Sequence, residues 1–187
     1  KYKDENGDGI VNNNDVVAIG ATTRPNLIYG LGVSATWNGF DFNVHFQGSG
    51  KSNFFINGFG VYPFVVGEWG NILDKMANSN RWILGVNEDT NAEYPRLSYG
   101  GNENNYRPST YWLRDGSYVR LKTLEMGYTL PKAISTKLRM EKLRIHVIGQ
   151  NILTFSKFNL WDPEMGSSNG MKYPLGKTVT VGLNINI

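Results

Sequence analysis

The sequence contains no cysteine, and only 19% of its 187 residues are charged. The absence of cysteine excludes a disulfide framework and a thiolate zinc site, although it does not fix the compartment. The formal net charge is only +3, and the basic residues are spread along the chain rather than gathered in a basic patch. We therefore expect no nucleic-acid partner.

Long apolar runs are also missing. No stretch approaches the roughly 18–20 residues that a membrane-spanning helix needs, which disfavours a helical membrane protein. A β-strand can still cross a bilayer, because only every second residue of such a strand faces lipid. The sequence begins at Lys1 with no signal-peptide pattern, so we expect the true N-terminus of the protein to lie elsewhere.

The residues that are abundant favour β-structure. Apolar residues make up 40% of the chain and aromatic residues 13%, there are 22 glycines, and asparagine is frequent throughout. The polar content is therefore carried more by uncharged side chains and glycine than by side chains that form salt bridges. This composition suits strands joined by long turns better than a solvated helical domain.

Alternation of apolar and polar residues predicts the strands. In Lys177–Ile187, the odd positions from Val179 onward are Val, Leu or Ile, and the even positions are Thr, Gly or Asn. A strict period of two over about ten residues has the length that a tilted strand needs to cross a bilayer. The same pattern predicts strands at Leu27–Trp37, Phe40–Gly48, Tyr118–Leu130 and Lys142–Asn151. Within Tyr118–Leu130 the parity changes near Lys122 and Thr123, which a β-bulge there or a strand end outside the bilayer would explain.

The connections alternate in length. Asn38-Gly39 is a strong hairpin signal, and Pro131–Glu141 is also short, whereas 49–117 and 152–176 are long. Outer-membrane barrels alternate in this way, with short periplasmic turns and long extracellular loops. We therefore predict an all-β chain, the C-terminal antiparallel strands of a large transmembrane barrel. Residues 1–26 would form an extracellular loop and residues 27–187 the strands and loops of the barrel.

A soluble β-sandwich is the main alternative, because its strands alternate as well. Three observations favour the barrel. The face opposite the apolar one is small and polar rather than charged, and two loops are too long for a compact sandwich. Aromatic residues also gather near strand ends: Tyr29, Trp37, Phe40, Tyr118 and Tyr128. Five strands cannot close a barrel, so we expect the chain to be part of a larger sheet.

The segment from Asp4 to Asp15 matches a calcium-binding loop. Oxygen ligands at this spacing can wrap one hard cation, and Gly9 allows the sharp turn in the middle. The predicted ligands are Asp4, Asn6, Asp8, the Ile10 carbonyl, Asn12 (through water) and Asp15. The pattern also resembles half of a dockerin repeat, although the second copy is missing. The alternative is an Asn/Asp/Gly-rich turn that holds no metal.

No catalytic set stands out. The sequence lacks the HExxH and GxSxG motifs and a recognisable Ser/His/Asp spacing, and we expect that the chain is not an enzyme. Gly48–Ser52 ends like a phosphate-binding loop, but His45 occupies the position of the first required glycine. The loop aromatics could stack on a sugar ring or on peptide side chains. The predicted ligand-contact residues are Trp69, Trp82, Trp112 and Trp161.

A series of motifs runs along the whole chain in a fixed order. They are Asp4–Asp15, Phe40–Phe42, Phe46–Gly48, Tyr118–Lys122, Gly127–Pro131, Gly149–Thr154, Asp162–Glu164, Tyr173–Pro174 and Lys177–Asn184. Taken together, these motifs resemble the C-terminal end of a SusC/RagA-like TonB-dependent transporter of the Bacteroidetes outer membrane, and their combination in this order is more specific than any one alone. One departure is the terminal Ile187, where outer-membrane barrels commonly end in an aromatic residue.

The resemblance implies a function and a set of partners. It implies nutrient import across the outer membrane, with oligosaccharide or sometimes peptide as cargo. It also implies a SusD-like surface lipoprotein as a lid, outer-membrane lipid around the barrel, and TonB acting through an N-terminal plug region that is absent from this chain. A secreted or surface carbohydrate-binding module with a dockerin-like calcium loop is the alternative from a different class.

Overall fold

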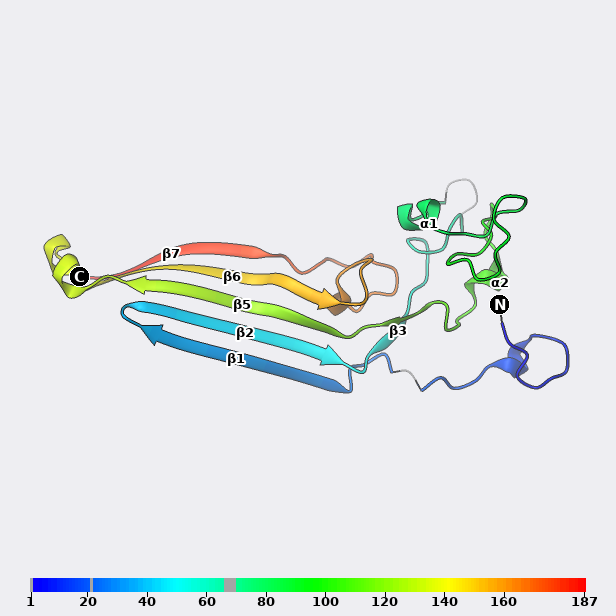
Figure 1. Cartoon of the computed structure of the whole chain (residues 1–187), viewed down its shortest axis with the longest axis horizontal. Helices are drawn as coiled ribbons and strands as arrows, with labels where there is room; N and C mark the ends of the chain where they lie inside the picture. The colour runs from blue at the N-terminus through cyan, green and yellow to red at the C-terminus, as the bar shows by residue number, and fades with distance from the viewer. Residues whose placement is uncertain (1, 21, 66–69) are drawn as a thin grey trace. The chain divides into compact units, whose positions relative to one another are not determined.

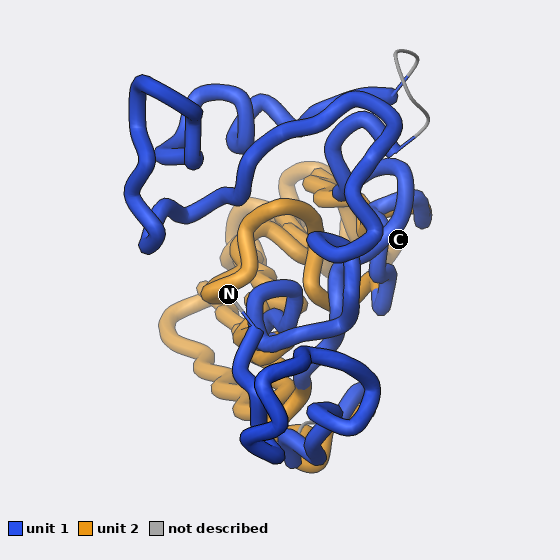
Figure 2. The backbone as a smooth tube through the Cα atoms, turned by 90° about the vertical axis from the view of Figure 1, so that its right-hand side faces the viewer, with its two compact units in different colours: residues 1–23, 53–115, 166–172 blue, residues 24–52, 116–165, 173–187 orange. Residues whose placement is uncertain are grey.

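The computed structural model describes residues 2–20, 22–65 and 70–187. The chain divides into two compact units, which Figure 2 colours separately. Unit 1 comprises residues 1–23, 53–115 and 166–172, and unit 2 comprises residues 24–52, 116–165 and 173–187. No helix in the described ranges is long and apolar enough to cross a membrane.

Unit 2 is built on an open antiparallel sheet. Five long strands lie side by side in the order β1-β2-β5-β6-β7 in the described part of the chain (Figure 1). Their bounds are β1 Leu27–Trp37, β2 Phe40–Gly50, β5 Tyr118–Thr129, β6 Lys142–Ser156 and β7 Thr178–Asn186. All five predicted strands and their antiparallel order are confirmed. The sheet is not closed, as expected for part of a barrel.

The predicted hairpin turn joins β1 to β2. Asn38 and Gly39 both have positive φ, 47° and 85°, which is the backbone of the turn that matches the twist of paired strands. A side chain at Gly39 would also clash with the end of β5, because a Cβ there would lie 2.7 Å from the Thr129 carbonyl oxygen. Glycine at this position is therefore required by both conformation and space.

The bulge that would explain the change of parity is present, and it has a counterpart that alternation did not predict. His45 pairs with Thr123 and Phe46 pairs with Leu121, so Lys122 is the extra residue of β5. The register between β5 and β6 shifts at the same level, where Asn151 adopts a positive φ of 54°. Beyond Asn151 the strand continues to Ser156, so the predicted end of β6 was too early. The left-handed backbone at Asn151 interrupts the period of two, so the alternation of apolar and polar residues predicts a strand end there.

One face of the sheet is apolar and open. The register places the side chains of Ala35, Phe42, Met126, Val147 and Val181 in one row across all five strands. Val181 is 70% exposed and Met126 57%. A soluble monomer rarely exposes a continuous apolar patch that covers a whole sheet face. The lipid-facing surface of a transmembrane barrel is a continuous apolar face of this kind.

The remaining elements of unit 2 are short. The helical turn between β5 and β6 contains α3 (Lys132–Ser135) and η3 (Thr136–Leu138). The connection between β6 and β7 contains the 3₁₀ turn η4 (Pro163–Met165).

Unit 1 consists of segments for which the sequence pattern predicts loops. Its elements are η1 Asn13–Asp15, β3 Asn53–Phe55, α1 Asp74–Asn78, α2 Glu103–Tyr106 and β4 Leu113–Asp115, and β3 pairs with β4. It has a small core of its own, in which Ile56, Val61, Met76, Tyr94 and Trp112 are buried. The long connection 49–117 is thus largely a packed unit rather than an extended loop.

Aromatic stacking holds the core of unit 1 together. The rings of Tyr62 and Tyr106 stack with centroids 4.4 Å apart, and Trp112 meets Tyr62 edge-on at 4.9 Å. The Trp112 indole N–H donates to the Asn105 carbonyl at 2.7 Å, and the Tyr106 hydroxyl donates to the Pro63 carbonyl at 2.6 Å. Buried aromatic residues with satisfied polar atoms contribute both area and specificity.

Candidate functional site

The polar face of the sheet carries a bridged ion cluster. Arg144 on β6 reaches across β5 to Asp41 on β2, with its Nε 2.9 Å from Oδ1, and its Nη2 lies 2.6 Å from Glu125 Oε1. Gly127 lies between the partners, and a Cβ there would be only 2.5 Å from Arg144 Nη2. Three adjacent strands are therefore tied together on the face opposite the apolar one.

A second cluster attaches the β6–β7 connection to the same face. Arg120 Nε lies 3.0 Å from Glu164 Oε2, and its Nη2 pairs with Asp162. Lys122, the bulge residue, donates to both carboxylate oxygens of Glu164 at 2.8 and 2.9 Å. Because of the bulge, the side chains of Arg120, Lys122 and Thr123 all lie on this polar face. Arg120 is 1% exposed, so a full positive charge is buried and neutralised here.

The two histidines lie on this polar face as well. The ring of His146 occupies the space beside Gly182, where a Cβ would be only 2.5 Å from Nε2, so it needs a residue without a side chain on the neighbouring strand. His45 lies farther from Gly30, where a Cβ would be 3.5 Å from Nε2, an ordinary contact distance.

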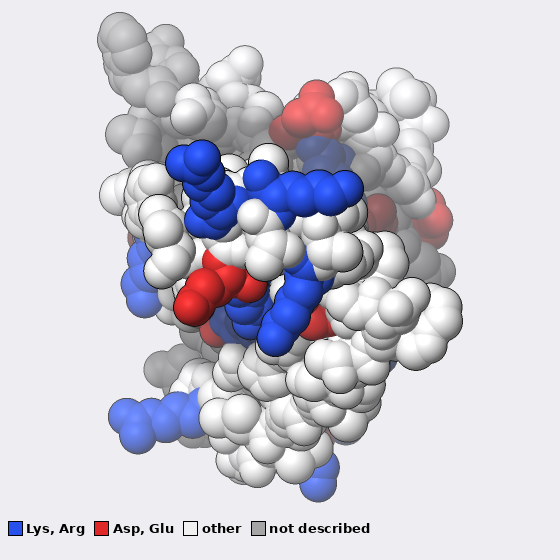
Figure 3. All heavy atoms as spheres, turned by 90° about the vertical axis from the view of Figure 1, so that its left-hand side faces the viewer, with Lys and Arg blue, Asp and Glu red and all other residues white. Residues whose placement is uncertain are grey.

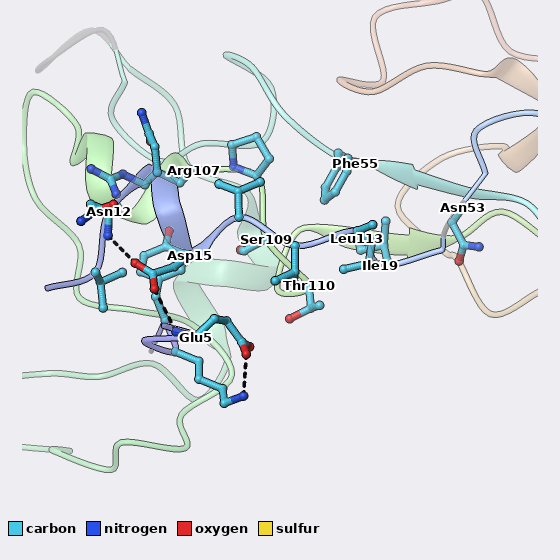
Figure 4. A pocket seen from close by; sticks show the side chains of 18 of the residues that line it. Glu5, Asn12, Asp15, Ile19, Asn53, Phe55, Arg107, Ser109, Thr110 and Leu113 are labelled. Carbon is cyan, nitrogen blue, oxygen red and sulfur yellow. Dashed lines mark hydrogen bonds and ion pairs between the residues drawn. The ribbon is translucent and has the colours of Figure 1, made fainter. Parts of the chain in front are cut away.

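Unit 1 contains a cavity of about 650 Å³ between its N-terminal segment and the chain around β4 (Figure 4). Its walls are mostly apolar, with Val11, Ile19, Phe55 and Leu113 among them, and Arg107 is a charged residue at its edge. A concave site with mainly apolar walls and a few polar groups is the usual form of a ligand pocket.

A second cavity in unit 1, of about 750 Å³, has a mixed lining that includes Trp82, Tyr94 and Tyr111. Two of these aromatics are fixed by the backbone, since the Trp82 N–H donates to the Tyr94 carbonyl at 2.9 Å. The Tyr111 hydroxyl donates to the Glu93 carbonyl at 2.8 Å. Burial raises the pKa of the Tyr94 phenol above its ordinary value. Aromatic faces beside polar groups suit sugars and peptides alike.

The four tryptophans predicted to contact ligand have different surroundings. Trp82 lines the second cavity, whereas Trp112 is 1% exposed and packs in the core of unit 1. Trp161 belongs to unit 2 and meets Phe158 edge-on at 4.9 Å. Trp69 lies outside the described residues. Tyr94 and Tyr111 belong to the loop aromatics that the sequence offers as possible ligand contacts, but only tertiary structure places them beside a cavity.

The acidic loop is closed by its own hydrogen bonds. Asp4 accepts from the backbone N–H groups of Gly7 at 2.6 Å and Gly9 at 2.8 Å, and Asp8 accepts from that of Ile10 at 2.8 Å. The two oxygens of Asp15 accept from the backbone N–H groups of Glu5 and Asn12. These are the local turns that Asp favours in loops.

Asn12 and Asp15 form a reciprocal cap around η1. The Asn12 side chain accepts from the Asn14 N–H at 2.7 Å, while Asp15 accepts from the Asn12 N–H. The hydrogen bonds from Asn12 and then from Glu5 lower the pKa of Asp15. The loop therefore gains stability above the ordinary pKa range of a carboxyl group, and it loses that stability as the pH falls through the lowered value.

The predicted metal ligands all lie within the loop from Asp4 to Asp15. Among the described residues, no group of three or more His, Asp or Glu side chains is placed to hold a metal ion. The oxygens of Asp4, Asp8 and Asp15 instead face loop N–H groups. Their chemistry suits calcium, and binding stays a prediction.

We expect weak calcium binding, on the order of 10⁻⁴–10⁻³ M as in extracellular modules. Calorimetric titration of the full-length protein should give a heat that Asp8→Ala removes. Asp89→Ala is the matched control, because Asp89 makes the same kind of turn in another loop by accepting from the Asn91 N–H at 2.8 Å. Equal heats for the wild type and Asp8→Ala would exclude the site.

No protein-family model matches the chain, but curated proteins do. TonB-dependent receptor P26 of Formosa agariphila is 30% identical over 99% of the chain, and receptor P3 of the same organism is 29% identical over 98%. The chain spans only 19% and 18% of these relatives.

Solved structures show the same fold. The RagAB peptide transporter aligns with 94% of the chain at a TM-score of 0.74 and 22% identity, over 19% of its own chain. The RagAB peptide importer in the closed-closed state aligns with 89% at a TM-score of 0.70 and 23% identity, over 18% of its own chain. The relatives are named as receptors and the structures as transporters, which supports the prediction that the chain is not an enzyme.

The apolar sheet face, the polar face opposite it and the similarity along nearly the whole chain all lead to one assignment. The expected resemblance and the expected outer-membrane location are confirmed. The chain belongs to the TonB-dependent receptors of the outer membrane, and it supplies strands of the β-barrel of such a receptor.

Proposed function

We propose that the full-length protein imports a nutrient across the outer membrane and that this chain forms part of its barrel wall and its extracellular vestibule. The observation that carries the proposal is the sheet of unit 2. Its apolar face is open across all five strands, while the opposite face is polar and cross-linked by ion clusters. A wall with lipid on one side and a polar lumen on the other needs this division.

The strand directions support an orientation. The connections at one end of the sheet are the Asn38-Gly39 turn and the short turn that contains α3 and η3, whereas the long connections leave from the other end (Figure 1). Long loops are extracellular in outer-membrane barrels. In this proposal unit 1, including residues 1–23, therefore lies outside the cell.

The partners follow from the same proposal. A SusD-like lipoprotein would cover the vestibule from outside, and TonB would supply energy through the N-terminal part of the full-length protein. RagAB, whose structures share this fold, is a peptide importer. For this protein we propose an oligosaccharide or a peptide as cargo, because the cavity that contains Trp82, Tyr94 and Tyr111 offers flat rings beside polar groups.

Trp82→Ala in the full-length transporter should reduce uptake of the cargo by about tenfold, because loss of one stacking ring removes on the order of 1–2 kcal/mol of binding. Growth of the host on single glycans and on peptides as the limiting nutrient would measure the effect and identify the cargo class. Tyr99→Ala is the matched control, since Tyr99 is an exposed aromatic of the same unit that is not among the residues lining either cavity described above.

Unchanged uptake for Trp82→Ala would remove the cavity from the transport path. If deletion of the whole gene leaves growth on every glycan and peptide unchanged, import itself is contradicted. The surface-module alternative would then gain support, provided that the protein is also soluble without detergent.

A further inference from the structure

The turn between β5 and β6 is strongly basic. Residues 131–142 contain four basic side chains and one acidic one, and all five are exposed. They are Lys132, Lys137, Arg139, Lys142 and Glu141. Figure 3, which views this end of the sheet, shows Lys and Arg side chains gathered on the surface around an acidic patch. The turn thus presents a net charge of +3 at one end of the sheet.

The same turn exposes apolar side chains. Ile134 in α3 is 48% exposed and Leu138 in η3 is 50% exposed. They are four residues apart in consecutive helical turns, a spacing that places side chains near one side of a helix. Ser135 between them is 1% exposed, so the turn packs at Ser135 while its two large apolar side chains remain outside. Two exposed apolar side chains do not stabilise a turn that is surrounded by water.

Aromatic residues mark the level at which this turn leaves the sheet. Phe40 and Tyr128 are cross-strand partners with ring centroids 4.5 Å apart, and Trp37 beside them is 78% exposed. The Thr129 N–H donates to the Gly39 carbonyl at 2.7 Å, which fixes the end of β5 against the hairpin turn. Exposed aromatic residues at strand ends sit at the headgroup level of a bilayer. The basic turn begins just beyond that level.

We propose that residues 131–142 bind the phosphate headgroups of anionic phospholipid in the leaflet at this end of the barrel. Lys132, Lys137 and Arg139 would pair with phosphate oxygens, while Ile134 and Leu138 enter the boundary between headgroups and acyl chains. The combination of basic and apolar side chains on a short surface element is the usual basis of interfacial binding. The inference rests on the proposed function, because it needs the apolar sheet face to lie in lipid.

The chemistry favours lipid over a protein partner. A negatively charged protein would be matched by the four cations, but it would not account for two exposed apolar side chains beside an aromatic belt. Anionic phospholipid matches all three features. If the turn binds an acidic protein rather than lipid, the wild-type transporter should show no preference for phosphatidylglycerol over phosphatidylcholine in the test below.

The test uses the full-length transporter in detergent, mixed with equal amounts of phosphatidylglycerol and phosphatidylcholine, with bound lipids counted by native mass spectrometry. The variant combines Lys132→Gln, Lys137→Gln and Arg139→Gln. The matched control combines Arg24→Gln, Lys51→Gln and Lys177→Gln, which removes two lysines and one arginine at the opposite end of the sheet. Each basic residue near an anionic surface changes affinity roughly fivefold.

We expect the variant to lose at least tenfold in retained phosphatidylglycerol, with phosphatidylcholine unchanged and the control close to wild type. Salt of about 1 M, where the screening length is ~3 Å, should reduce the wild-type preference in the same way. Equal phosphatidylglycerol retention by variant and wild type would overturn the proposal. If the triple variant does not fold, Lys137→Gln alone decides, with an expected loss of about fivefold.

The proposed function is measured separately, by the outer-membrane content of the wild-type protein and its cargo uptake. A wild type that is absent from the outer membrane contradicts the function. A transporter that inserts and imports normally, but shows no lipid selectivity at this turn, contradicts only the lipid site.

Discussion

Val181→Arg in the full-length transporter is expected to remove most of the folded, outer-membrane population, whereas Thr180→Arg should leave most of it in place. Val181 lies in the central strand region of β7, is 70% exposed and stands in the apolar row with Val147 and Met126. A charge on the lipid face near mid-bilayer costs about 2–4 kcal/mol. Each 1.4 kcal/mol is a factor of about ten in an equilibrium.

Thr180 is the matched neighbour, because it faces the other way. It pairs with Ile148 on the polar face, beside the row that contains His146 and Gly182. An arginine there can reach the water-filled or protein-filled lumen. Heat-dependent migration of the barrel on a gel, together with its amount in purified outer membrane, measures both variants.

A soluble sandwich would also reject Val181→Arg, so a second pair of variants separates the two architectures. In the barrel, Val181→Cys should react with an apolar thiol reagent confined to the membrane, and Thr180→Cys should not. If neither cysteine reacts from the lipid phase and the protein remains soluble without detergent, the barrel assignment is contradicted. Equal reaction of both would contradict the assignment of faces.

The sheet could be predicted from the sequence because every strand carries its own signal. A lipid-facing strand needs an apolar side chain at each second position, so the alternation within Lys177–Ile187 is enough to predict a strand there. The bulge at Lys122 was predictable for the same reason, since an extra residue reverses the parity. At Asn151 the left-handed backbone also broke the pattern, but the strand resumed, and local alternation could not show this.

Unit 1 could not be predicted, because its order comes from contacts distant in sequence. Its small sheet pairs Asn53–Phe55 with Leu113–Asp115, and its aromatic core joins Tyr62, Tyr106 and Trp112. No periodic pattern marks these positions. Composition alone made Trp82 and Trp112 equal candidates for ligand contact, and only burial separates a residue that lines a cavity from one that fills a core.

The ion cluster at Arg120 shows what the motifs of this family do in this chain. The sequence presented Tyr118–Lys122 and Asp162–Glu164 as separate motifs without saying why they occur together. In the structure the first supplies two cations and the second two carboxylates, and the pairs join β5 to the β6–β7 connection. The bulge is part of this arrangement, because it lets Lys122 reach Glu164.

Arg120→Met should be the most destabilising change in this cluster. Arg120 is 1% exposed, pairs with Asp162 and Glu164, and its guanidinium lies 5.7 Å from the centre of the Tyr118 ring. Removing one partner of a buried ion pair costs about 3–5 kcal/mol, and here Asp162 would be left without a cation while Lys122 still pairs with Glu164. Lys122→Met is the matched control: its side chain is 20% exposed, and Arg120 can still neutralise Glu164, so about 1 kcal/mol or less is expected.

Thermal unfolding of the detergent-solubilised full-length receptor would measure both variants, and the double variant Arg120→Met, Asp162→Asn tests the cause. If the uncompensated Asp162 carboxylate is responsible, neutralising it should recover most of the stability lost in Arg120→Met. If packing of the arginine stem is responsible, the double variant should remain as unstable as the single one. Equal unfolding temperatures for Arg120→Met, Lys122→Met and wild type would contradict the view that this cluster attaches the connection to the sheet.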